Sequence, residues 1–173
     1  MKHLKILLSF LLYFSLSLNV FSQKKSDCTF YVDKTDPKTG ATIEKIKTKL
    51  TGTDNFFVII NRNDTAYTLT LNFWISGALK EQINPKDPAT IKLSGWKNLV
   101  LHGTQTVKPV MHYDDQTWSE YAPEYPIRAA DLKKLTDTKP LNLHLNVGIE
   151  PFSRDFNEKD NDKIIEIIKC IMK

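Results

Sequence analysis

Regular alternation of apolar and polar residues in two long stretches constrains the fold of this chain more than any other feature. In residues 67–75 every second position is apolar, and the positions between carry Thr, Asn or Trp. Residues 141–149 repeat the pattern, with Leu, Val and Ile on one side and Asn, His and Gly on the other. Successive side chains of a strand point to opposite faces, so a period of two predicts strands with one face on a core and one in water. Such half-buried strands are typical of antiparallel sheets.

Further strands are predicted on both sides of the first stretch. Residues 56–60 are a continuous run of β-branched and aromatic side chains, which is typical of a central strand. The Asn and Asp residues of 61–64 predict a hairpin turn that leads into the strand at 65–75. Shorter or weaker strands are predicted at residues 28–32, 42–50, 90–93, 98–102 and 106–112. Pro109 places the last of these at a sheet edge, because proline has no N–H to donate to a neighbouring strand.

A helix is predicted at the end of the chain. Apolar side chains recur there at the three-to-four spacing of one helical face, at positions 164, 165, 167, 168, 171 and 172. Asp160 or Asn161 is expected to cap this helix, and residues 127–135 support one or two helical turns at best. Together these patterns predict an α+β fold, either a mainly antiparallel β-sheet or an open sandwich, with the C-terminal α-helix packed on it.

The first 22 residues have the pattern of an export signal. Lys2 and Lys5 precede an apolar and hydroxyl run at 6–18, and small residues stand at the −3 and −1 positions of a cleavage site after Ser22. The run is too short and too diluted by polar residues for a membrane span. We therefore expect a signal peptide at 1–22, a single exported domain at 23–173 with no membrane span, and a periplasmic or secreted location.

Charge and motifs limit the classes of function. Removal of the signal peptide leaves 22 basic and 20 acidic residues, a net charge of +2, which argues against nucleic acid as a partner. The chain has no Gly-x-Ser-x-Gly, no His-Glu-x-x-His and no phosphate-binding loop. His112 lies near Asp114 and Asp115, but a metal site needs three or four convergent ligands. The sequence therefore predicts no catalytic residues, no metal and no cofactor, and it favours a protein without enzymatic activity.

Two cysteines are present, Cys28 and Cys170. In an exported protein with no third cysteine, a disulfide between them is expected. A bridge that closes almost the whole chain would restrict the unfolded ensemble strongly, by about 5 kcal/mol in the chain-entropy model. We expect this disulfide to be structural rather than redox-active.

Residues 113–125 form the segment with the strongest suggestion of ligand binding. It places aromatic rings among carboxylates, and we take Trp118, Tyr121, Asp114, Asp115 and Glu120 as candidate ligand-binding residues. Flat rings stack on the apolar faces of sugars, and carboxylates accept hydrogen bonds from hydroxyl groups. The same composition also fits an ordinary loop whose aromatic residues pack on the domain. Asp115 and Glu120 would suit the acid and base of a glycoside hydrolase if their separation were right.

Thr65 is a candidate glycosylation site beside the predicted hairpin turn. Asp64-Thr65-Ala66 resembles the short acceptor sequence for O-glycans on exported proteins of Bacteroidota. Asn63-Asp64-Thr65 is also an N-glycosylation sequon, meaningful in a host that uses it.

Several short motifs together resemble small exported Bacteroidota proteins of unknown function. These motifs are the Phe-Ser-Gln that ends the signal, Asp36-Pro37-x-Thr39-Gly40, Tyr125-x-Ile127-x-x-x-Asp131-Leu132-x-x-Leu135, and Ile164-x-x-Ile167-Ile168-Lys169-Cys170. The resemblance implies a periplasmic or secreted single domain and carries no known activity.

The function expected from these observations is that of an exported, non-enzymatic domain that binds a protein or glycan ligand. Binding would use the 113–125 segment or an exposed sheet edge. One alternative is a carbohydrate-active or metal-dependent hydrolase that uses carboxylates of this segment, and another is a structural component of the cell envelope. A binding segment should keep Trp118 and Tyr121 exposed, whereas a hydrolase should place two carboxylates across a cleft.

Overall fold

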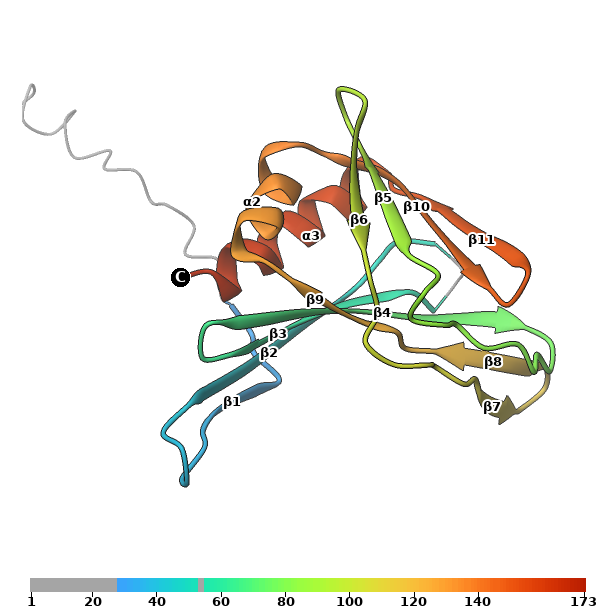
Figure 1. Ribbon diagram of the computed structural model, residues 1–173, viewed down its shortest axis with the longest axis horizontal. Helices are drawn as coiled ribbons and strands as arrows, with labels where there is room; N and C mark the ends of the chain where they lie inside the picture. Colours follow the sequence, from blue (N-terminus) through green and yellow to red (C-terminus); the bar gives the residue numbers. More distant parts are fainter. Residues whose placement is uncertain (1–27, 53–54) are drawn as a thin grey trace, which may run out of the picture.

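The structure is a computed structural model that describes residues 28–52 and 55–173 (Figure 1). Within these residues the chain forms two antiparallel β-sheets and two helices. The signal peptide predicted at 1–22 lies outside the described residues. None of the helices in the described part of the chain is long and apolar enough to cross a membrane.

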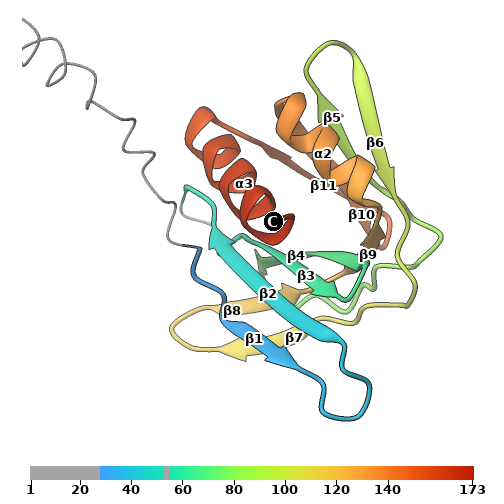
Figure 2. The same cartoon turned by 90° about the vertical axis from the view of Figure 1, so that its left-hand side faces the viewer.

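The larger sheet has seven strands and curls strongly along its length (Figures 1 and 2). Its order is β1-β2-β3-β4-β8-β7, and β9 pairs with the first half of β4 while β8 pairs with the second half. The strands span Val32–Thr35 (β1), Thr42–Lys49 (β2), Phe57–Asn63 (β3), Ala66–Ser76 (β4), Val110–Tyr113 (β7), Thr117–Tyr121 (β8) and Glu124–Ile127 (β9).

The smaller sheet and the helices cover one face of the larger sheet, which leaves its other face open (Figure 1). The smaller sheet has the order β11-β10-β5-β6. Its strands span Ala89–Leu93 (β5), Lys97–Leu101 (β6), Pro140–Val147 (β10) and Glu150–Asp155 (β11), and the helices span Ala129–Asp137 (α2) and Glu158–Ile171 (α3). We call the two sides of the larger sheet the covered face and the open face.

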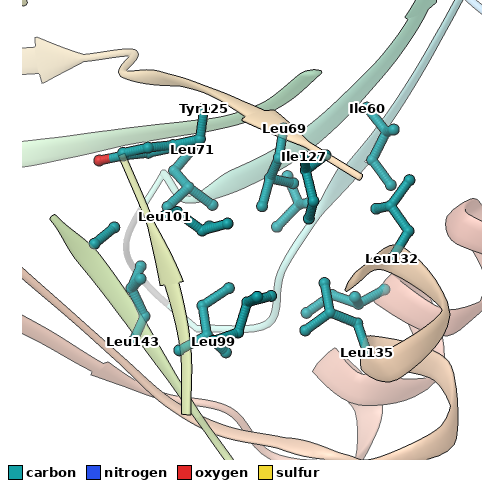
Figure 3. Close-up of a cluster of buried hydrophobic side chains, with 14 of the residues drawn as sticks. Ile60, Leu69, Leu71, Leu99, Leu101, Tyr125, Ile127, Leu132, Leu135 and Leu143 are labelled. Carbon is teal, nitrogen blue, oxygen red and sulfur yellow. The ribbon is translucent and has the colours of Figure 1, made fainter. Parts of the chain in front are cut away.

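The hydrophobic core lies between the covered face, the smaller sheet and the helices (Figure 3). The alternation in β4 decides which side chains enter it, because Leu69, Leu71 and Phe73 are buried and point to the covered face. Phe73 stacks on Phe152 of β11 with ring centroids 4.4 Å apart, which joins the two sheets. The predicted α+β fold with a C-terminal helix packed on an antiparallel sheet is confirmed.

The burial predicted for the second alternating stretch is correct in the middle of the stretch and wrong at both ends. Leu143, Leu145 and Val147 of β10 are buried, as the period of two predicts. Leu141 is exposed because the register of β10 against β5 shifts between Pro140 and Asn142. Ile149 is 91% exposed because it lies in the turn between β10 and β11 rather than in a strand.

The N-terminus of α3 is tied to the chain that follows β2. Asn157 is the N-cap, since its side chain accepts a hydrogen bond from the Asp160 N–H at 2.9 Å, so the predicted cap at Asp160 or Asn161 is wrong by one turn. The carboxylate of Asp160 instead accepts hydrogen bonds from the Thr51 N–H at 2.6 Å and the Thr51 hydroxyl at 2.7 Å. Arg154 approaches its second oxygen at 3.6 Å. Asp160 is 1% exposed, so these contacts stabilise a buried charge.

The opposite end of α3 carries the predicted disulfide. Cys170 in its last turn is bonded to Cys28, with Cα atoms 5.6 Å apart and a sequence separation of 142. The bond fixes the start of the described chain to the last helix. The expected disulfide is therefore confirmed.

Candidate binding face

The segment at 113–125 is not a loop but the β7–β8 hairpin followed by β9. Asp114 and Asp115 lie at its exposed tip, where the Asp114 N–H donates to the Gln116 carbonyl at 3.3 Å. Tyr121 is fully buried, and its hydroxyl donates to the carbonyl of Glu81 at 2.9 Å. Burial, together with the nearby charge of Glu81, raises the pKa of Tyr121 to about 12. The expectation that Tyr121 is exposed for ligand stacking is wrong.

Strand alternation separates the five candidate residues. In β8, Ser119 and Tyr121 point to the covered face, whereas Trp118 and Glu120 point to the open face and are half-buried. The candidates therefore fall into three places: the hairpin tip for the two aspartates, the core for Tyr121, and the open face for Trp118 and Glu120.

Glu120 is the centre of a hydrogen-bonded group on the open face. The side-chain amide of Asn72 in β4 donates to Glu120 Oε1 at 2.5 Å, and His112 Nε2 in β7 lies 2.6 Å from Glu120 Oε2. The register explains this convergence, because Glu120 lies between Trp74 of β4 and Val110 of β7. Three neighbouring strands thus contribute one side chain each to the same contact.

Two tryptophans flank this group. The ring of His112 stacks on Trp74, with centroids 4.4 Å apart and an angle of 9° between planes. Trp118 lies directly opposite His112 across the β7–β8 pair and shares its face. We call the set Asn72, Trp74, His112, Trp118 and Glu120 the open-face cluster.

The protonation of Glu120 follows from its partners. Partial burial acts to raise the pKa of this carboxyl, but the hydrogen bonds from Asn72 and His112, with a smaller contribution from Trp74, outweigh it. The pKa of Glu120 is therefore below its ordinary value, and the group is a carboxylate at neutral pH. Chemically, the open-face cluster presents half-buried aromatic rings beside a fixed negative hydrogen-bond acceptor.

Lysine side chains extend the open face across β2. Lys47 places its ammonium 3.9 Å from the centroid of the Phe57 ring in β3, and Lys49 lies 5.6 Å from the same centroid. Phe57 is paired with Asn72 of the open-face cluster. The open face therefore combines aromatic, cationic and anionic groups on adjacent strands.

A second site lies at one end of the molecule and is separate from the open-face cluster. A cavity of about 290 Å³ is lined by Ile75 at the end of β4, by Leu79 and Glu81 of the following segment, and by residues of the β10–β11 hairpin. We call it the end cavity. In the described parts of the chain, no group of three or more His, Cys, Asp and Glu side chains is arranged to hold a metal ion.

Thr65 lies in the exposed two-residue turn between β3 and β4. Asp64 before it has a φ of +56°, a conformation that Asp tolerates better than most residues. The turn is shorter than the predicted 61–64 loop and lies later in the chain, because β3 continues to Asn63, which pairs with Ala66. The position is accessible to modification, and the modification itself stays a prediction.

Sequence reasoning missed Asn72, Trp74 and the contact that His112 makes. The available signal was alternation, since Asn72 and Trp74 lie on the polar side of the first alternating stretch. The pairing of β4 with β8 across 40 residues of chain could not be obtained from that pattern. Trp96 was also missed; it is 98% exposed at the β5–β6 turn with a φ of +63°.

Comparison with known proteins assigns no family to the chain. No protein-family model matches it, and no curated protein or solved structure is significantly similar to it.

Proposed function

We propose that this protein is an exported binding domain that recognises a glycan on the open face of its larger sheet. The observation that carries the proposal is the open-face cluster, in which Trp74 and Trp118 flank a carboxylate held by Asn72 and His112. Aromatic faces suit the apolar faces of sugar rings, and a fixed carboxylate accepts hydrogen bonds from hydroxyl groups.

The cluster is held in place before any ligand binds. Glu120 accepts hydrogen bonds at both oxygens, and the His112 ring is fixed between this carboxylate and Trp74. Side chains that are already ordered lose less conformational entropy on binding, which favours affinity. The elements that present them are strands of a sheet whose other face is the core, so the support is rigid as well.

The protonation state of Glu120 favours a binding function over glycoside hydrolysis. A general acid of a glycosidase has a raised pKa, so that it holds a proton to give to the leaving group. The pKa of Glu120 is instead lowered. Asp115, the second carboxyl considered for catalysis, lies at the exposed hairpin tip rather than on the open face.

The proposed location outside the cytoplasm rests on two features. The sequence of residues 1–22 has the pattern of a signal peptide. The Cys28–Cys170 disulfide is of the kind that persists in oxidising compartments. Membrane-fraction and culture-supernatant analysis of the native host, with N-terminal sequencing of the mature protein, would test it: a retained Met1 in the cytoplasm would contradict export.

The binding proposal is tested with a panel of neutral and basic oligosaccharides on the protein that begins at Gln23, read by calorimetry. We expect at least one glycan to bind the parent and to bind Trp118→Ala and Trp74→Ala about tenfold more weakly, the order expected for losing one aromatic contact. Trp96→Ala is the matched control, because this tryptophan lies in the β5–β6 turn of the other sheet. An equal loss of glycan affinity in all three variants, or no binding by any glycan, would refute the proposal.

A further inference from the structure

We propose that the end cavity binds a small organic cation, an amine carried on an apolar ring or short chain. This goes beyond the proposed glycan site, because the end cavity and the open-face cluster share no residue. The apolar part of its lining consists of Ile75, Leu79, Val147, Pro151 and Phe152, and the polar part consists of two glutamates.

The volume and the aromatic lining of the end cavity suit a ring. Its volume of about 290 Å³ is roughly twice that of an apolar cavity of ~150 Å³ that holds benzene. Phe152 in the lining stacks on the buried Phe73 at 4.4 Å, and Phe73 stacks on Tyr121 at 5.7 Å. The aromatic part of the lining is therefore continuous with the stacked rings of the core.

One wall of the end cavity, the segment that follows β4, is fastened to the core by hydrogen bonds. Ser119 Oγ accepts from the Leu79 N–H at 2.8 Å and donates to the Gly77 carbonyl at 2.7 Å. Tyr121 donates its hydroxyl proton to the Glu81 carbonyl at 2.9 Å. Both donors come from β8 and are fully buried, so this wall is fixed without a ligand.

The opposite wall, the β10–β11 hairpin, is held directly against the first. The Gly148 N–H donates to the Gln82 carbonyl at 3.0 Å. Gly148 has a φ of +63°, and a Cβ at this position would lie 2.8 Å from the Cγ of Glu81. Only glycine allows this approach, which brings Glu81 of one wall next to the hairpin that carries Glu150.

The charge at the end cavity selects the ligand. Glu81 and Glu150 are both exposed, so they lie at the mouth, while the apolar lining residues other than Pro151 are buried or half-buried. Among the described residues that line the cavity there is no Lys, Arg or His. An apolar body inside with an ammonium group at the carboxylates satisfies both features.

The test uses three probes with the same ten-carbon skeleton that differ in the group at its end: 4-phenylbutylamine, 4-phenylbutanol and 4-phenylbutyrate. Binding to the full exported chain is followed by NMR titration, with the methyl signals of Ile75 and Val147 and the ring signals of Phe152 as reporters. We expect the amine to bind most tightly, the butyrate most weakly, and the affinity of the amine to fall with added salt.

Variants separate this site from the glycan site. Glu150→Gln and Glu81→Gln should each weaken amine binding about two- to fivefold, the size of an exposed ion pair, and leave the alcohol unchanged. Glu166→Gln, an exposed position on α3, is the control, and Trp74→Ala should not alter amine binding. No binding by any probe, an alcohol that binds as tightly as the amine, or signals that shift outside the end cavity would each overturn the proposal.

Discussion

Phe73 and Trp74 are neighbours on β4, yet they belong to different parts of the molecule. Phe73 points to the covered face, is fully buried and stacks on Phe152 of the other sheet. Trp74 points to the open face, is half-buried and stacks on His112. Tyr121 and Glu120 on β8 repeat the contrast. One face of the sheet therefore provides stability, while the other holds ordered aromatic and charged groups that the core does not need.

The largest expected effect is the difference in stability lost when each of these two neighbours is replaced by alanine. Phe73→Ala should lower the free energy of unfolding by about 3–5 kcal/mol, because it leaves a cavity between the sheets. Trp74→Ala should lower it by about 1 kcal/mol, since the side chain is only half-buried. Urea denaturation followed by circular dichroism measures both. A loss from Trp74→Ala as large as that from Phe73→Ala would show that the open face is part of the stabilising core.

The covered side also depends on one buried charge. Asp160→Ala should lower the free energy of unfolding by about 3–5 kcal/mol, because it leaves Arg154 and Thr51 without the carboxylate that they contact. Asp162→Ala is the matched control: it removes an exposed carboxylate from the same helical turn and should change stability by about 0.5 kcal/mol or less. Similar losses of unfolding free energy in the two variants would show that the charge acts through the helix dipole and not through the buried contacts of Asp160.

The disulfide should affect stability without affecting binding. The double variant Cys28→Ser and Cys170→Ser should lose about 2–5 kcal/mol of unfolding free energy, because the unfolded chain regains the freedom that a 142-residue closure removes. Its glycan affinity should match that of the parent at a temperature where it is folded, since the bond ties α3 on the covered side. A loss of binding by the folded variant would contradict this separation of the two faces.

The smallest expected effect is the change with pH in the stability that the open-face cluster contributes. The pKa of Glu120 is lowered in the folded state, so its contribution to stability is present above the unfolded pKa of about 4 and is lost as the pH falls through the lower folded value. Hydrogen bonds from Arg128 and Lys134 also lower the pKa of Asp131, so its contribution to stability is lost at acid pH in the same way. Thermal denaturation from pH 6 to pH 3 should show Glu120→Gln losing less stability than the parent, by about 0.2–1 kcal/mol. A steeper loss of stability in the variant than in the parent would contradict a lowered pKa for Glu120.

The elements of this fold could be predicted from sequence wherever one face of a strand is buried. Leu69, Leu71 and Phe73 follow a period of two because only that period places them all in the core. The pattern failed at Ile149, where a turn begins, and at Leu141, where the register shifts. The exception at Leu141 depends on its partner strand β5, which is far away in the sequence, whereas the exception at Ile149 depends on where the β10–β11 hairpin turns.

The candidate site was predictable only in part, for the same physical reason. The sequence points to Trp118 and Glu120 but groups the buried Tyr121 with them, because an acidic, proline-containing segment has the composition of a loop. In a strand, Glu120 and Tyr121 must point to opposite faces. Asn72 and His112 join Glu120 through pairings between three strands, and the end cavity forms between two sheets, so neither has a local signature.

The most direct test of a binding open face is to follow the three tryptophans of the chain at once. Each indole N–H gives a separate proton–nitrogen NMR signal, and the positions are 74, 96 and 118. On titration with a glycan that binds in calorimetry, the signals of Trp74 and Trp118 should shift with one common affinity while that of Trp96, at the tip of the other sheet, stays still. A shift of Trp96 alone, or binding that leaves Trp74 and Trp118 unchanged, would contradict the assignment of the open face.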